Sequence, residues 1–171
     1  NFSLEQLSSL PYLEKSELRK YGKVELLAKN YDKKGGFLNS SGSTGTPVSI
    51  YYSNQFHQQW FAACEVRMRH WAGIDYTMPR GMIGGRRILG NQNPDNKVFH
   101  RYNFAEKQTY FSAYHISREN APFYLEAIVK HKVSYMTGYA VSNYILAKFF
   151  KELGLKVPKM KAVLTSSEKL T

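Results

Sequence analysis

The chain has 171 residues, of which 43% are hydrophobic, with 24 Lys and Arg against 13 Asp and Glu and a single cysteine. The length and hydrophobic content predict a globular protein with a core and exclude a disordered chain, and one cysteine excludes an internal disulfide. No apolar run is long enough to cross a bilayer, and no charged leader with an apolar segment opens the sequence, so we expect cytoplasmic localisation without a transmembrane segment.

The first 35 residues predict a helical lead-in made of two short helices. Ser3 and Gln6 have the spacing of a capping box, and Ser16 is the predicted N-cap of the second helix. The apolar side chains expected to face inward are Leu18, Leu26 and Leu27. Residues 32–36 are rich in turn formers and mark a boundary before the next segment.

Residues 40–47 concentrate hydroxyl side chains and glycines in one short loop. The loop consists of Ser40, Ser41, Gly42, Ser43, Thr44, Gly45, Thr46 and Pro47. Because glycine tolerates positive φ, successive backbone N–H groups can turn inward as an anion-binding nest while the hydroxyls add donors. Composition leaves two interpretations open, a phosphate-binding loop and a flexible Ser/Gly linker. The loop has neither the Walker spacing, since no Lys follows Gly45, nor the Rossmann glycine spacing.

A strand and a long helix are predicted after this loop. Residues 48–52 are β-branched and aromatic, as in a strand. Asn54 is the predicted N-cap of a helix that runs to about Trp71, and Gly73 is the expected residue after its end. Residues 79–114 predict short strands joined by loops, with an exposed turn at 91–96.

The last third of the chain predicts a βαβ unit. A helix over 117–132 precedes a strand at 133–136, a helix over 142–153 and a strand at 162–164, so the two strands should be parallel. The predicted fold class is therefore α/β, with helices packed on a mixed or parallel sheet. Ligands in such sheets bind beyond the carboxyl ends of strands, where Gly138, Tyr139 and residues 165–168 fall. From the residues alone, ordinary turn chemistry at strand ends is favoured over a ligand site for these residues.

Residues 40–47 resemble the phosphate-binding loop of the adenylate-forming (AMP-forming) superfamily. Within it, the chain is most similar to the phenylacetate–coenzyme A ligase group and its capsular polysaccharide biosynthesis branch, the CapK proteins. Segments that carry the resemblance outside the loop are residues 10–13, 17–19, 71–73, 84–87, 101–103, 113–117, 138–139 and 165–168.

The resemblance implies an N-terminal fragment of an ATP-dependent, acyl-adenylate-forming ligase. Residues 1–171 would be a single partial domain, the first portion of the large domain, with the lead-in at 1–35 and the α/β part at 36–171. The implied reactants are ATP with Mg²⁺ and a small carboxylic acid, with coenzyme A or another molecule as acceptor. The catalytic residues are expected beyond Thr171, so we expect residues 1–171 alone to show no turnover.

The resemblance also assigns roles to particular residues. Residues 40–47 would hold the β- and γ-phosphates of ATP. The segment expected against the adenine is Ser166, Ser167 and Glu168, and the expected acyl pocket is lined by His115, Gly138 and Tyr139. One departure is that Val48 follows Pro47 where these loops often carry a Lys, so another cation would have to replace it.

Other interpretations of the same residues remain open. His115 fits a histidine packed at the end of a sheet as well as an acyl-pocket residue, and Arg86 with Arg87 fits an exposed pair better than a phosphate site. The scattered histidines and one cysteine predict no metal site. The formal net charge of +11 also fits a basic, non-catalytic module that binds nucleic acid or another polyanion. No RNA-recognition motif is present, so no nucleic-acid partner is expected.

Overall fold

The computed structural model describes residues 3–40, 46–86, 88 and 97–167. The chain divides into two compact units, Asn1–Ala62 and Ala63–Thr171, which are described separately. The assignment of both units to one partial domain remains a prediction. None of the described helices is both long enough and apolar enough to cross a bilayer.

The first unit begins with two short helices, as predicted, but their caps differ from the prediction. The 3₁₀-helix η1 (Leu4–Ser9) is preceded by a hydrogen bond from the Ser3 amide to the Gln6 side chain (3.0 Å), which is half of the expected capping box. The prediction that Ser16 caps α1 (Lys15–Tyr21) is wrong, because Glu14 is the N-cap and forms a reciprocal capping box with Glu17. A carboxylate at this position accepts a backbone N–H as a Ser hydroxyl does.

The inward-facing leucines of the lead-in are only partly confirmed. Leu18 and Leu27 are half-buried, whereas Leu26 is exposed. Leu26 lies beyond the end of α1, so its spacing from Leu18 does not place it on the same helix face.

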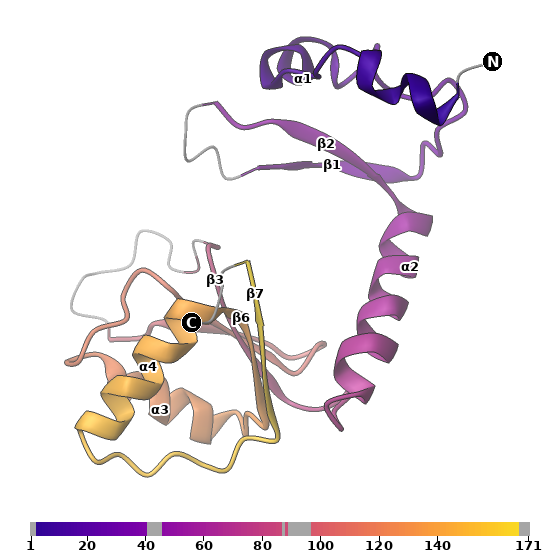
Figure 1. The fold of residues 1–171 in the computed structure, drawn as a ribbon. Coiled ribbons are helices and arrows are strands. Elements are labelled where there is room, and N and C mark those ends of the chain that lie inside the picture. The colour runs from indigo at the N-terminus through magenta and orange to yellow at the C-terminus, as the bar shows by residue number, and fades with distance from the viewer. Residues whose placement is uncertain (1–2, 41–45, 87, 89–96, 168–171) are drawn as a thin grey trace. The chain divides into compact units, whose positions relative to one another are not determined.

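A β-hairpin follows the lead-in (Figure 1). Strand β1 (Gly35–Asn39) pairs antiparallel with β2 (Ser49–Ser53), which confirms the predicted strand to within one residue. The turn predicted at 32–36 is partly wrong, because Gly35 and Gly36 already belong to β1. Glycine is unfavourable inside strands, so the sequence pattern of this glycine pair predicts a turn and not a strand.

The long helix predicted after the hairpin is present in two segments. α2 (Asn54–Cys64) continues into η2 (Glu65–His70), which has π-helical hydrogen bonding. Its N-cap is Ser53 instead of Asn54, since the Ser53 hydroxyl accepts the Phe56 amide (3.1 Å). Gly73 has a φ of 68° after the helix end, which confirms its predicted role.

The described part of the second unit contains a five-stranded sheet in the order β4-β5-β3-β6-β7. The strands are β3 (Arg80–Gly84), β4 (His100–Asn103), β5 (Gln108–Ser112), β6 (Tyr135–Tyr139) and β7 (Ala162–Ser166). All neighbouring pairs are parallel except β4 with β5, which is antiparallel. The predicted α/β class, the strands of the middle segment and the parallel βαβ unit are therefore confirmed. The turn predicted at 91–96 lies outside the described residues.

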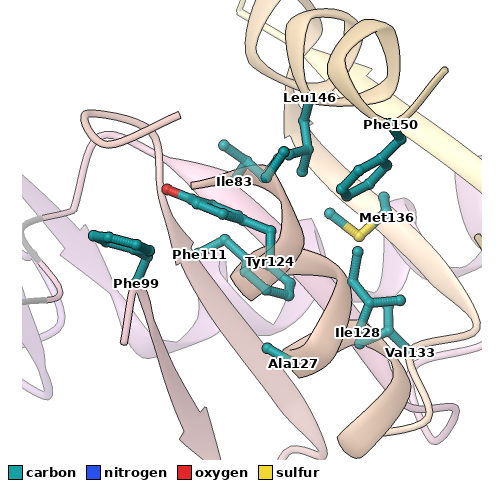
Figure 2. Packing of buried hydrophobic residues seen from close by; sticks show 11 residues of the cluster. Ile83, Phe99, Phe111, Tyr124, Ala127, Ile128, Val133, Met136, Leu146 and Phe150 are labelled. Carbon is teal, nitrogen blue, oxygen red and sulfur yellow. The ribbon is translucent and has the colours of Figure 1, made fainter. Parts of the chain in front are cut away.

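Two helices cover one face of this sheet. α3 (Ala121–Lys130) and α4 (Ala140–Glu152) pack against the face that carries Ile83, Phe111 and Met136 (Figures 1 and 2). Successive side chains of a strand point to opposite faces of the sheet. The strand register puts the side chains of these three residues on the same face, where they form a common core. Gly154, in the left-handed region with a φ of 63°, follows the end of α4.

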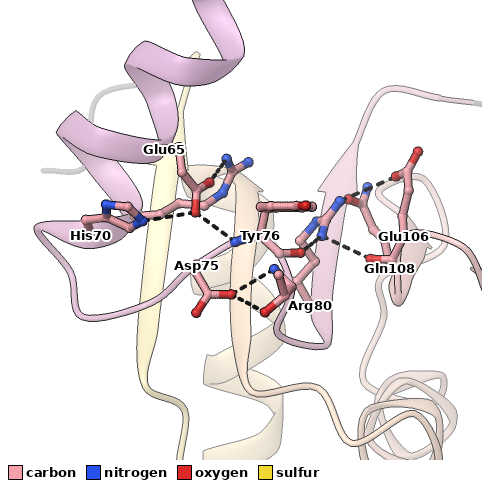
Figure 3. A network of polar contacts seen from close by, with 9 residues as sticks. Glu65, His70, Asp75, Tyr76, Arg80, Glu106 and Gln108 are labelled. Carbon is pink, nitrogen blue, oxygen red and sulfur yellow. Dashed lines mark hydrogen bonds and ion pairs between the residues drawn. The ribbon is translucent and has the colours of Figure 1, made fainter. Parts of the chain in front are cut away.

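A polar network fixes the amino end of β3 (Figure 3). Arg80 is buried and donates through Nη1 to the carbonyls of Tyr76 (2.6 Å) and Glu106 (3.0 Å), and through Nε to the Gln108 side chain. Its Nη2 also lies 3.4 Å from the Glu106 carboxylate. Because the guanidinium is hydrogen-bonded on all sides, its burial is compensated.

Candidate functional site

The hydroxyl-rich loop connects the two strands of the β-hairpin. Ser40 and Val48 are joined by two hydrogen bonds of 2.9 Å, from the Ser40 amide to the Val48 carbonyl and from the Val48 amide to the Ser40 hydroxyl. Residues 41–45 lie outside the described residues. The described ends of the loop are therefore held together, which makes it a short connection instead of an extended linker.

The second described end of the loop contacts α1. The Arg19 Nε donates to the Thr46 carbonyl at 2.9 Å, and the Arg19 side chain is exposed. Residues 40–47 contain no acidic side chain, so their hydroxyls and backbone amides favour an anion over a cation.

A second candidate site is the carboxyl edge of the sheet in the second unit. Strands β3, β5, β6 and β7 are parallel, so the residues that follow them meet at one edge. The residues predicted to line the acyl pocket lie at this edge, and so do the described residues of the predicted adenine segment. They are His115, Gly138, Tyr139, Ser166 and Ser167. Glu168 lies outside the described residues.

Two tyrosines converge on the backbone after β3. The Tyr114 hydroxyl donates to the Gly85 carbonyl at 3.1 Å. A Cβ atom at Gly85 would lie 2.7 Å from the Tyr139 hydroxyl, so a side chain there would require the end of Tyr139 to shift. Tyr139 is thus placed at the turn after β3 as well as at the end of β6.

His115 is held at the end of β5 by three neighbours. Its Nδ1 lies 2.8 Å from the Ser112 hydroxyl, its carbonyl accepts the Asn120 side-chain amide (3.0 Å), and its ring stacks on Phe99 with centroids 5.6 Å apart. The side chain is exposed. This arrangement fixes the ring, and among the described residues no hydrogen bond of its Nε2 is seen, so it fits both an acyl-pocket residue and the alternative of a packed histidine.

Gly138 allows β6 to lie close to β3. Its φ of 117° is rare for residues with a side chain, and a Cβ there would overlap the Ile83 carbonyl. Beside it, the Asn143 amide donates to the Tyr139 carbonyl at 2.8 Å. Asn143 also lines an apolar cavity of about 290 Å³ whose other walls include Met136, Phe150 and Thr165. An apolar cavity therefore lies next to the segment predicted to bind an acyl group.

The predicted adenine segment lies at the end of β7. Ser166 and Ser167 are both exposed, and Ser167 has a φ of 68°, which is uncommon for a residue other than glycine. The adenine role of both residues remains a prediction.

The described residues contain no cluster of three or more His, Cys, Asp and Glu side chains that could hold a metal ion.

Three contacts of the two candidate sites were missed by sequence reasoning. Arg19, Ser112 and Gly85 each contact a predicted site residue or its neighbour. Only Ser112 has a local signal, since it precedes His115 by three residues. Arg19 and Thr46 are 27 residues apart, and no local pattern predicts their contact.

The fold and the two candidate sites define the class of the molecule. It is an α/β protein with a hydroxyl-rich hairpin loop and a mostly parallel sheet whose carboxyl edge carries polar side chains.

The chain is similar to protein CapK of Staphylococcus aureus, with 26% identity over 151 residues. These residues cover 88% of this chain and 33% of CapK, so the chain spans about a third of the length of this curated relative. No protein-family model and no solved structure matches the chain. The similarity is distant and is consistent with a CapK-like protein.

Proposed function

We propose that the chain is the N-terminal part of an ATP-dependent, carboxylate-activating ligase of the phenylacetate–coenzyme A ligase and CapK type. The observation that carries the proposal is the loop at residues 40–47, whose described ends are held together by Ser40 and Val48. The distant similarity to CapK and the α/β fold support it. A role in capsular polysaccharide biosynthesis is part of the same proposal.

In the proposed reaction, an oxygen of the substrate carboxylate attacks the α-phosphorus of ATP. The bond from the α-phosphorus to the bridging oxygen breaks, and pyrophosphate leaves, so that an acyl adenylate forms. Residues 40–47 would hold the β- and γ-phosphates, which stabilises the leaving group without covalent chemistry. A thiol such as that of coenzyme A, or another acceptor, would then displace AMP from the acyl carbonyl.

At the carboxyl edge of the sheet, His115, Gly138 and Tyr139 would line the acyl site. Ser166, Ser167 and Glu168 would lie against the adenine. The cavity next to Asn143 suits a small apolar acyl group.

The test is pyrophosphate release by the full-length protein with ATP and a panel of carboxylic acids. Replacing Gly42 with Ala and Thr44 with Val together should abolish release and leave the circular dichroism spectrum near that of the wild type. Ser49→Ala is a matched control, because the Ser49 hydroxyl bonds Asn39 outside the loop (2.6 Å). Unchanged release by the double variant would refute the loop's role.

A basic polyanion-binding module is the second candidate, and the net charge of +11 is the observation in its favour. Labelled single-stranded RNA and fluorescent ATP distinguish the two functions over a salt series. Ligase function predicts a saturable ATP site. The alternative predicts RNA binding that weakens steeply with salt and no saturable ATP site.

A further inference from the structure

Two arginines of the second unit share the ring of one tyrosine. The Cζ atom of Arg86 lies 5.5 Å from the centre of the Tyr110 ring, and that of Arg101 lies 5.6 Å from it. Tyr110 is buried, with 8% of its surface exposed, whereas both arginines are exposed. Each guanidinium therefore lies between a buried aromatic ring and the solvent.

The strand register places this cluster on one face of the sheet. Arg101 of β4 lies directly opposite Tyr110 of β5, and residues opposite each other in an antiparallel pair point to the same face. Phe111, the next residue of β5, belongs to the core under α3 and α4, so Tyr110 and Arg101 lie on the other face. Arg86 contacts the same ring from the segment after β3, the strand beside β5. Three neighbouring strands therefore bring two positive charges together near the carboxyl edge of the sheet.

No carboxylate balances this pair of charges among the described residues. None of the ion pairs found there includes Arg86 or Arg101. Glu106 accepts a hydrogen bond from the Tyr110 hydroxyl (3.2 Å), but its carboxylate also lies 3.4 Å from Nη2 of the buried Arg80 (Figure 3). The charge of Glu106 is therefore shared with Arg80, and the two exposed guanidiniums repel each other unless an anion binds between them.

The arrangement of the two guanidiniums suits a diphosphate. A guanidinium that stacks on a ring keeps its N–H groups in its own plane as a fork, and this fork matches phosphate oxygens. Contact with the ring also restricts the guanidinium before a ligand arrives, which lowers the entropy cost of binding. Both Cζ atoms lie within 5.6 Å of one ring centre, so the two phosphate groups of one diphosphate can contact both arginines.

We propose that Arg86 and Arg101 form an anion site that binds a diphosphate group on this face of the sheet. The sequence alone favoured exposed arginines at 86 and 87, because no local pattern indicates Arg101 as a neighbour of Arg86. The site belongs to the second unit and shares no residue with the loop at residues 40–47, so the inference does not depend on the proposed function.

The test is titration calorimetry of the full-length protein with inorganic pyrophosphate. It is done in the Gly42→Ala, Thr44→Val variant, because this background removes the other site proposed for phosphates and leaves both arginines unchanged. Arg86→Gln, Arg101→Gln and the combination of the two are compared in this background. Arg67→Gln is the matched control, since Arg67 is an exposed arginine of η2 in the same unit. Circular dichroism checks that each variant is folded.

We expect each single glutamine variant to weaken pyrophosphate binding by about tenfold and the combined variant by about 100-fold, because each change removes a charge-assisted contact. Arg67→Gln should change the affinity by less than about twofold, since a distant exposed charge is screened. Arg86→Lys combined with Arg101→Lys should restore part of the affinity, because it keeps the charges and loses the forks.

Three results would overturn the inference. They are unchanged affinity in the combined glutamine variant, an equal loss in Arg67→Gln, and no pyrophosphate binding in the background variant. Because the background already lacks the loop residues proposed to bind ATP, these results have the same meaning whether or not residues 40–47 bind a nucleotide.

Inorganic phosphate, ADP and coenzyme A define the ligand further. Inorganic phosphate should bind more weakly than pyrophosphate, since it offers one phosphate group to two arginines, and equal affinities would contradict a diphosphate site. ADP carries a terminal diphosphate and coenzyme A an internal one. Tighter binding of one of them, lost in the combined glutamine variant, identifies the source of the diphosphate, and binding of neither identifies pyrophosphate itself as the ligand.

Discussion

Gly138 lies where β6 comes closest to β3, and its backbone conformation tolerates no side chain. Its φ is 117°, and a Cβ there would overlap the Ile83 carbonyl. We expect Gly138→Ala to lower the free energy of unfolding by about 2–4 kcal/mol in a urea titration. Gly84→Ala is the control, because a Cβ at Gly84 would meet only the Met82 methyl at 3.6 Å. Equal stability of the two variants would contradict the strain at Gly138.

Arg80 and Glu106 should contribute unequally to stability although they form an ion pair. Arg80 is buried and bonded to Tyr76, Gln108 and the Glu106 backbone, whereas the Glu106 side chain is 47% exposed. Arg80→Met leaves one buried and two partly buried acceptors without a donor and should cost about 2–4 kcal/mol of unfolding free energy. Glu106→Gln should cost less than about 1 kcal/mol. Chemical denaturation of both variants measures the difference in unfolding free energy. Equal losses in the two variants would contradict the expectation and would mean that the ion pair with the exposed Glu106 carboxylate is the main contribution of Arg80.

For single residues, the sequence predicted the positions of candidate site residues in the fold better than it predicted their contacts. Gly138 and Tyr139 were predicted to follow a strand at 133–136, and the structure instead makes them the last two residues of β6, at the carboxyl edge of the sheet. The pairing of Arg19 with Thr46 depends on how α1 packs on the hairpin, which local sequence does not record. The ligand roles of all these residues remain predictions.

At the element scale, prediction succeeded where one pattern dominated. α3, α4, β6 and β7 have apolar periodicity with helix-ending residues such as Gly154, and each was predicted within a few residues. β1 was missed because Gly35 and Gly36 suggest a turn. Ser53 and Asn54 are both good N-caps, so the choice between them depended on geometry.

The contact between β4 and α3 should make the second unit sensitive to acid. His100 of β4 and His131, which caps α3, have Nε2 atoms 3.2 Å apart, and Tyr102 stacks on His131. Burial lowers the pKa of both histidines from 6.5, and the charge of His131 and then of Lys130 lowers that of His100 further, against a smaller opposing effect of Glu126.

Because these two histidines bind protons less readily in the folded state than in the unfolded state, their protonation favours unfolding. The stability of the second unit is therefore unaffected by this pair above about pH 6.5 and decreases as the pH falls below that value. We expect the Tm to fall between pH 6.5 and 5, with no contribution from this pair between pH 7 and 8. His131→Gln should reduce the slope in the acidic range, as followed by differential scanning calorimetry. A slope as steep as that of the wild type would show that other groups cause it.

At the whole-molecule scale, the two units differ in how much apolar surface they bury. Among the residues whose burial the structure describes, Val48 is the one buried hydrophobic residue of the first unit, and the others belong to the second. Side chains such as Phe37, Trp60 and Phe61 are exposed in the first unit.

We therefore expect faster amide hydrogen exchange in β1 and β2 than in β5 and β6 of the 171-residue chain, as measured by mass spectrometry. The hairpin is held by its backbone pairing and by exposed side-chain contacts such as that of Ser49 with Asn39, whereas β5 and β6 lie under α3 and α4. Similar protection in both units would mean that the hairpin is stabilised by more than its described contacts.

The proposed function depends most on binding of the triphosphate of ATP by residues 40–47. The most direct measurement is a crystal structure of the full-length protein with a non-hydrolysable ATP analogue. We expect β- and γ-phosphate oxygens within hydrogen-bond distance of the backbone amides and hydroxyls of this loop. A well-ordered analogue whose triphosphate lies away from residues 40–47 would contradict it.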